Sequence, residues 1–255
     1  MCLILFAFQQ HPDYPLVVIA NRDEYYARPT ESAGWWLAPS NIHAGRDLQA
    51  GGTWLGVNRA GRFAAVTNVR EAGGMTPGAF SRGELPPGFL SSDIEAENYI
   101  EQLEENGAQY AGYNLLFGDQ NSLWFQSNRD VESRKISAGI YGVSNGRFDE
   151  GWPKLASGRN DLEQMLRDKF DVQSLLSILT DDNTALDEAL PATGVSLDVE
   201  RLLSSRFIRS TEYGTRACTV VLFDRHNRCH FIEQNFVDAE NKGDLVECRF
   251  DISSP

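Results

Sequence analysis

The chain has 255 residues, of which 42% are hydrophobic and 23% charged, and its formal net charge is −13. This length and composition are typical of a protein with an ordinary apolar core, and we expect a single domain over residues 1–255. The acidic balance argues against nucleic acid or an anionic membrane surface as a partner.

The sequence predicts neither a membrane span nor a secretion signal. The apolar run at the N-terminus is too short for a signal peptide and has no basic region before it. No stretch approaches the ~20 apolar residues that a membrane-spanning helix needs. We therefore expect a cytoplasmic protein with reduced cysteines.

A cysteine directly follows the initiator methionine, and a strand-like apolar run follows the cysteine. Methionine is normally removed when the next residue is small, so we expect the mature chain to begin with Cys2. Its thiol would have an unperturbed pKa of about 8.5 and its free α-amine one of about 7.7–8.0. One residue would then supply both a nucleophile and a base. The alternative interpretation is a small apolar residue that happens to stand at position 2.

The first third of the chain predicts strands. A turn at 11–15 separates the N-terminal run from a second apolar run at 16–20, which indicates a hairpin. That run leads into the polar residues 21–24, and polar residues at a strand end often build sites. Further strands are expected after the glycine turn at 51–56 and at 63–68.

Residues 71–91 are rich in glycine and proline, which predicts a long binding loop or lid. Ser92 and Glu95 form a capping-box pattern, and apolar residues at helical spacing follow up to Asn106. Other helices are expected at 153–170, from Asp171 onward and at 186–190. Later strands are expected at 113–117, 123–126, 140–143, 219–223, 229–233 and 246–250. Strands and helices that alternate in runs, with short turns between strands, indicate an α+β fold with largely antiparallel sheets.

Three predicted strand ends carry polar side chains: residues 21–24, Asn68 with Arg70, and residues 144–145. If the sheets gather these ends near Cys2, they form one cleft. Asparagine can donate to a developing oxyanion there, and arginine can orient a carbonyl or carboxylate. The alternative for each asparagine is a cap at a turn or strand end.

No cofactor or metal is predicted. His226, Cys229 and His230 lie across a tight turn without a fourth ligand nearby. The glycine turn at 51–56 lacks the lysine and the spacing of a phosphate-binding loop.

Several short motifs together resemble the NRDE family, also called the transport and Golgi organisation 2 family, from Met1 to about Phe223. The motifs are Met1-Cys2-Leu3-Ile4, Asn21-Arg22-Asp23-Glu24, Gly51-Gly52-Thr53-Trp54-Leu55-Gly56, Thr67-Asn68-Val69-Arg70, Ser81-Arg82-Gly83, Tyr113-Asn114-Leu115-Leu116, Ser144-Asn145 and Tyr213-Gly214-Thr215-Arg216. The resemblance implies an N-terminal-nucleophile hydrolase fold: an α+β, four-layer αββα sandwich of two stacked, mainly antiparallel sheets. The N-terminal pattern is also similar to choloylglycine hydrolases and penicillin V acylases, in which an N-terminal cysteine attacks an amide.

The resemblance also implies a set of site residues. Cys2 matches the nucleophile, Asn145 the oxyanion asparagine and Asn68 a second such asparagine. The arginine and aspartate of the acylases match Arg22 and Asp23 with an offset of a residue or two, so Asn21 or Glu24 could hold those roles instead. For the late arginine, Arg216 fits the family motif and Arg206 fits the acylases. The expected substrate-binding residues are Trp54, Arg70, Arg82 and Asn114.

Two functions follow from this reading. The first is an amidohydrolase that cleaves a non-peptide C–N bond of a linear or acyl amide. The second is a non-catalytic carrier or chaperone that binds haem or an acyl-type ligand in the same cleft.

Overall fold

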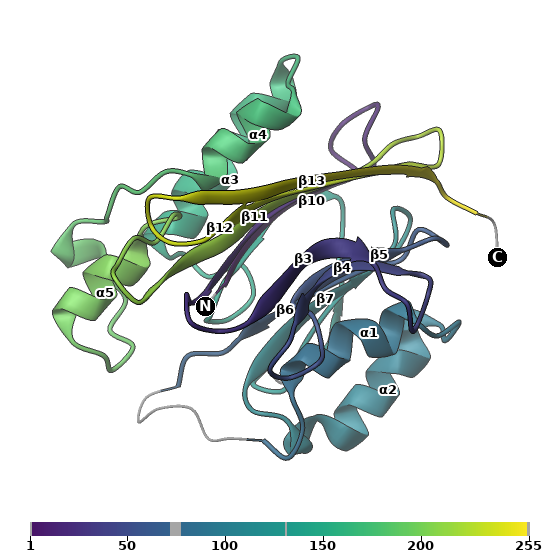
Figure 1. Cartoon of the computed structure of the whole chain (residues 1–255), viewed down its shortest axis with the longest axis horizontal. Coiled ribbons are helices and arrows are strands. Elements are labelled where there is room, and N and C mark those ends of the chain that lie inside the picture. The colour runs from purple at the N-terminus through teal and green to yellow at the C-terminus, as the bar shows by residue number, and fades with distance from the viewer. Residues whose placement is uncertain (1, 72–77, 131, 254–255) are drawn as a thin grey trace.

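Two antiparallel sheets lie face to face in the computed structural model, which describes residues 2–71, 78–130 and 132–253 (Figure 1). The six-stranded sheet has the order β10 (Gly139–Val143), β1 (Cys2–Phe8), β2 (Leu16–Tyr25), β11 (Tyr213–Phe223), β12 (Arg228–Phe236) and β13 (Lys242–Asp251). The seven-stranded sheet has the order β3 (Thr30–Trp35), β4 (Ile42–Asp47), β5 (Leu55–Asn58), β6 (Phe63–Asn68), β7 (Tyr113–Gly118), β8 (Leu123–Ser127) and β9 (Arg134–Lys135). Neighbouring strands in both sheets pair antiparallel.

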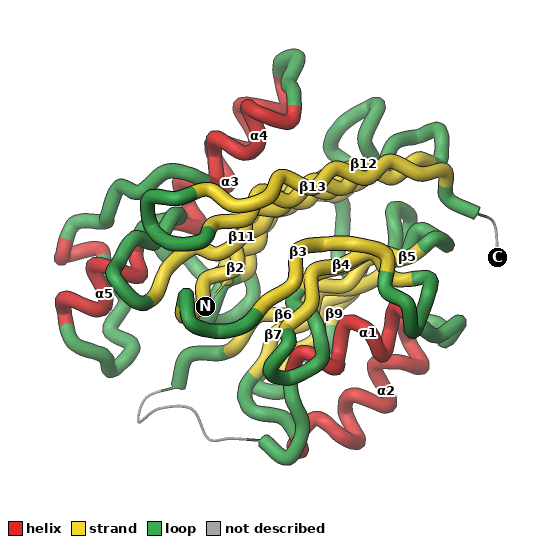
Figure 2. Tube along the Cα trace, viewed as in Figure 1, coloured by secondary structure: helices red, strands yellow, loops and turns green. Residues whose placement is uncertain are grey.

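Helices cover the outer face of each sheet (Figure 2). The seven-stranded sheet packs against α1 (Leu85–Leu90) and α2 (Ala96–Asn106). The six-stranded sheet packs against α3 (Pro153–Arg167) and α4 (Val172–Leu179), and α5 (Leu197–Ser204) lies on the same side. Single 3-10 turns occur at Arg82–Glu84, Gly107–Gln109 and Asp187–Ala189. These layers confirm the expected α+β αββα sandwich.

The alternation of side chains along β1 sets where Cys2 points. Ile4, Phe6 and Phe8 are buried in the core between the two sheets. Leu3 and Leu5 are buried in the core between the six-stranded sheet and its helices. Because successive side chains of a strand point to opposite faces, the Cys2 side chain points into the space between the sheets.

The polar residues 21–24 lie inside β2 and not after its end, which corrects the expected strand boundary. β2 pairs with β1 as far as Arg22 and with β11 as far as Tyr25. This pairing supplies backbone partners to the polar residues, so the strand continues despite their low β-propensity.

The expected loop at 71–91 contains the 3-10 turn Arg82–Glu84 and the helix α1. Ser81 and Glu84 form a capping box at the 3-10 turn, whereas the expected box at Ser92 and Glu95 does not form and α2 begins after Glu95 without a side-chain cap. Pro86 stands in the first turn of α1, where it loses no helical hydrogen bond. Residues 72–77 of this loop lie outside the described residues. The segment 186–190 contains only a 3-10 turn, and β3, β4 and α5 were not expected from the sequence.

None of the helices in the described parts of the chain has the length and apolar character that a membrane crossing needs.

Candidate functional site

Cys2 is the first residue of β1, between β10 and β2, and it pairs with Arg22 across the ladder. Arg22 therefore shares the face that points between the sheets. Its guanidinium lies 4.3 Å from the centroid of the Trp54 ring, and it donates to Thr30 Oγ1 at 3.1 Å and to Asp47 Oδ2 at 3.3 Å. These contacts hold a cation that is 5% exposed beside the thiol.

The neighbours of Arg22 in β2 point to the opposite face, toward the helices. Asn21 Nδ2 donates to the backbone oxygens of Leu179 and Arg206, so it ties β2 to the helical layer and takes no part in the cleft. Asp23 is 2% exposed, and its Oδ1 accepts from Thr215 Oγ1 at 2.7 Å. The backbone N–H of Asp23 lies close enough to the Cys2 thiol to lower its pKa.

One cleft of about 300 Å³ contains the thiol. Its lining includes Cys2, Arg22, Asp23, Glu24, Trp54, Asn68 and Arg82. The segment that carries Arg82 comes from the expected binding loop, and Arg82 donates to the Gly112 carbonyl oxygen at 3.1 Å. The structure thus brings five other sequence-predicted site residues into one cleft with Cys2, and Glu24 also lines it.

Asn68 and Asn145 form a single hydrogen-bonded unit beside this cleft. Asn145 is fully buried, and its Nδ2 lies 2.9 Å from both the backbone oxygen and Oδ1 of Asn68. A backbone carbonyl oxygen accepts only, so the facing atom of Asn145 must be its NH₂ group, and the atom of Asn68 that it meets must be the acceptor. The NH₂ group of Asn68 is therefore directed away from Asn145.

Ser144 connects this unit to the nucleophile. Its Oγ lies 2.9 Å from the backbone oxygen of Cys2 and 3.2 Å from Oδ1 of Asn145, although Ser144 and Cys2 are 142 positions apart in the sequence. Thr67 and Asn114 both donate to the Ser144 backbone oxygen. Asn114 thus supports the strand end that carries Asn145.

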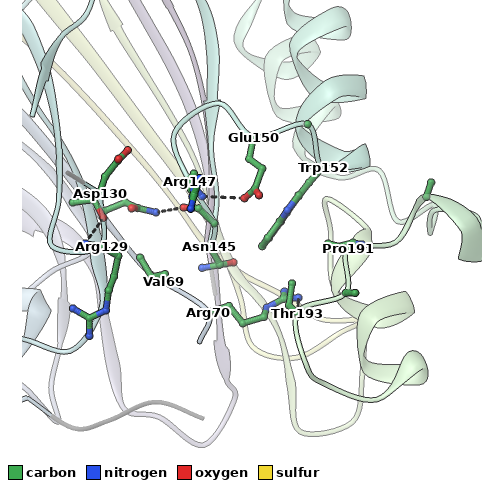
Figure 3. A pocket seen from close by; sticks show the side chains of 16 residues that line it. Val69, Arg70, Arg129, Asp130, Asn145, Arg147, Glu150, Trp152, Pro191 and Thr193 are labelled. Atoms are coloured by element: carbon green, nitrogen blue, oxygen red, sulfur yellow. Dashed lines mark hydrogen bonds between the residues drawn. The ribbon is translucent and has the colours of Figure 1, made fainter. Parts of the chain in front are cut away.

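A second pocket of about 690 Å³ lies on the other side of Asn145 (Figure 3). Figure 3 shows Asn145 at its centre, with Arg70 below it and Trp152 and Arg129 on opposite sides. Arg70 Nη1 donates hydrogen bonds to Glu200 Oε2 and Thr193 Oγ1, both at 2.9 Å. The backbone N–H of Arg70 donates to the backbone oxygen of Asn145. The predicted substrate residues therefore divide: Trp54 and Arg82 line the Cys2 cleft, and Arg70 and Asn114 line this pocket.

Neither candidate for the late arginine has a contact with Cys2 among the described residues. Arg216 Nη1 donates to the backbone oxygens of Tyr25, Tyr26 and Arg28, which fixes the turn after β2. Arg206 lies on the helical side and pairs with Asp161 and Asp181.

Burial dominates the electrostatics of the thiol. It raises the pKa of Cys2 above its ordinary value, and the Arg22 guanidinium and the Asp23 N–H offset part of that rise. At neutral pH the thiol is therefore mostly protonated, and attack on a carbonyl requires a base that removes its proton.

Sequence reasoning missed Lys154 at the start of α3, because helical lysines are ordinarily exposed. Lys154 is 3% exposed, and in the described parts of the chain its Nζ has no hydrogen-bond partner. Burial lowers its pKa from 10.5 to about 8, although Asp23 and Cys2 act in the opposite direction. The sequence signal was its place directly after Trp152-Pro153, the N-cap and first residue of α3, which put Lys154 in the first turn of the helix.

Comparison with known proteins places these residues in a family. A model of the family described as Transport and Golgi organisation 2 matches residues 1–238. The chain is similar to the Transport and Golgi organization protein 2 homolog of Bos taurus, with 32% identity over 265 residues, 94% of this chain and 95% of that protein. The Transport and Golgi organization protein 2 of Drosophila melanogaster is 26% identical over 96% of this chain and 95% of its own. Among solved structures, the C2A mutant of the conjugated bile acid hydrolase from Clostridium perfringens aligns with a TM-score of 0.51 and 9% identity, over 97% of this chain and 92% of that chain, which supports the fold.

Proposed function

The chain belongs to the Transport and Golgi organisation 2 family and has an N-terminal-nucleophile hydrolase-like fold, and on this premise we propose that it is an amide hydrolase whose nucleophile is Cys2. Its substrate class is a linear or acyl amide with a non-peptide C–N bond. The observation that carries the proposal is that one cleft contains the Cys2 thiol, the fixed Arg22 cation and the Asn68 amide. These are a nucleophile, an electrostatic stabiliser and an oxyanion donor.

The reaction begins once Met1 has been removed. The α-amine of Cys2 accepts the thiol proton, and the thiolate attacks the carbonyl carbon of the amide. The NH₂ group of Asn68, which Asn145 directs away from itself, donates to the oxyanion that forms. Asn145 acts through Asn68 and is a positioning residue in this scheme.

The tetrahedral intermediate then collapses. The ammonium of Cys2 gives its proton to the leaving nitrogen, the C–N bond breaks, and a free amine departs from an acyl thioester on Cys2. The same α-amine deprotonates a water molecule that attacks the thioester. A carboxylic acid leaves, and the thiol is restored.

A panel of acyl amides that varies the acyl chain and the amine tests this proposal. The native protein is expected to release acid and amine from at least one member, and Cys2→Ala is expected to reduce release to the uncatalysed background. Cys248→Ala is the matched control, because Cys248 is also a partly buried free cysteine but lies in β13. Binding of a panel member or of haem without hydrolysis would favour the carrier function over the hydrolase. An equal loss of hydrolysis in Cys2→Ala and Cys248→Ala would contradict the assignment of Cys2 as the nucleophile.

A further inference from the structure

Lys154 is a buried cation on the helical side of the six-stranded sheet. Its side chain is 3% exposed and, in the described parts of the chain, makes no hydrogen bond through Nζ. Burying an ammonium without partners costs free energy, so a lysine at such a position usually interacts with a charged group nearby. The proposed reaction as written above assigns Lys154 no role.

The packing of α3 brings Lys154 to the end of the sheet where β1 begins. Leu155 lies against Gly142 of β10, and Gly158 lies against Leu5 of β1 so closely that a Cβ at position 158 would stand 2.6 Å from Leu5 Cδ1. Lys154 is one turn before Gly158, and it lines a small void with Trp152, Arg70 and Glu200. Arg70 follows β6, whose last residue is Asn68 of the Cys2 cleft.

The charged groups around Lys154 come from several elements. Asp23 from β2, Arg70 after β6 and Cys2 from β1 act on it, in that order of effect. Glu200 from α5 also lies close, but its carboxylate is bonded to Arg70 at 2.9 Å. Tyr213 from β11 donates through its hydroxyl to the Asp23 backbone oxygen, and burial raises its pKa so that it stays neutral. Asp23 is therefore the carboxylate with which the Lys154 ammonium interacts.

We propose that Lys154 is a positioning residue that shares Asp23 with the α-amine of Cys2 and thereby keeps that amine unprotonated at neutral pH. The inference rests on the proposed function, because it concerns the base of that reaction. The amino nitrogen of Cys2 lies on β1, next to the strand that carries Asp23. The single negative charge of Asp23 can offset only one of the two neighbouring positive charges. When Lys154 carries that positive charge, its repulsion disfavours protonation of the Cys2 α-amine.

The test follows the titration of Cys2 itself and needs no substrate. The full chain is prepared with Cys2 at its N-terminus by cleavage of a leader at that position, so that the result does not depend on Met1 processing. Carbon-13 in cysteine then reports the amine through Cα and the thiol through Cβ, and the Cys2 signals are assigned by their loss in Cys2→Ala.

The wild-type amine is expected to titrate below its ordinary range of about 7.7–8.0. In Lys154→Met the amine midpoint should move up, with about a 3- to 10-fold higher ratio of protonated to neutral amine at pH 7. In Lys154→Arg, which keeps the cation, the midpoint should stay within about 2-fold of the wild-type ratio. A purely structural lysine would not move this midpoint.

A midpoint that is the same in wild type and in folded Lys154→Met would overturn the inference, and so would an upward shift of the same size in Lys154→Arg. If Lys154→Met does not fold, a wild-type amine that titrates at or above its ordinary range contradicts the inference on its own. If the α-amine of Cys2 titrates below its ordinary range but no amide of the panel is hydrolysed, the result would count against the proposed hydrolysis alone.

Discussion

Asn68→Ala is expected to lower kcat by about 10²–10³ on any amide that the panel identifies, because removal of one oxyanion donor typically has that effect. Asn68 lines the cleft of the thiol, and its amide orientation is fixed by Asn145. The donor acts on the charge that develops in the transition state, so KM should change little. Steady-state kinetics of the variant and the wild type measure both constants.

The two asparagines act as one unit, which gives a second expectation from the same kinetics. Asn145→Ala should lower kcat less than Asn68→Ala, and the double variant should be no slower than Asn68→Ala alone. Asn121→Ala is the control, because Asn121 lies in an exposed turn between β7 and β8. An Asn68→Ala variant within about 3-fold of the wild-type kcat would contradict the oxyanion assignment, given that a lost donor costs ~10² or more.

Lys154→Met is expected to stabilise the folded chain by about 3–4 kcal/mol at pH 7, since each pKa unit corresponds to about 1.4 kcal/mol. The pKa of Lys154 is about 8 in the folded chain against an ordinary 10.5. The unfolded chain therefore binds more protons between these two pH values, and the stability contributed by Lys154 rises with pH across that window. Methionine fills the same space without a charge to desolvate.

Urea denaturation at a series of pH values measures this effect. The gain of Lys154→Met over the wild type should be at its full value at pH 7 and at any pH below about 8, and should shrink toward zero as the pH rises from about 8 past 10.5. Lys169→Met, at an exposed position after α3, should change stability by less than about 0.5 kcal/mol. A Lys154→Met variant that is less stable than the wild type at pH 7 would show that the attraction of Asp23 for the ammonium outweighs the cost of burying it, contrary to the lowered pKa of Lys154.

Much of the fold was predictable because its longest strands have strong patterns. The N-terminal hairpin combines apolar runs with a turn rich in proline, and both strands occur as expected. β3 was missed because Thr30–Trp35 is half-exposed and contains a glycine, a serine and an alanine, so neither periodicity nor β-propensity identifies it. The cap at Ser81 was missed because the proline pair in α1 indicates a loop, although proline is tolerated in the first turn of a helix.

The site was only partly predictable for a related reason. Family motifs supplied Cys2, Asn68 and Asn145, but not the hydrogen bonds by which Asn145 Nδ2 meets the backbone oxygen and Oδ1 of Asn68. The sequence also did not give the register of Cys2 with Arg22, which places Arg22 beside the thiol and Asn21 toward the helices. No motif identifies Lys154, whose burial follows from the approach of α3 to the sheet.

The intact mass of the native protein tests the central claim most directly, because the proposed base exists only if Cys2 is the first residue. The account predicts a chain that lacks Met1, so that the thiol and a free α-amine stand on one residue. A native mass that retains Met1 would leave the nitrogen of Cys2 in a peptide bond, and an N-terminal-nucleophile mechanism at Cys2 would then be contradicted.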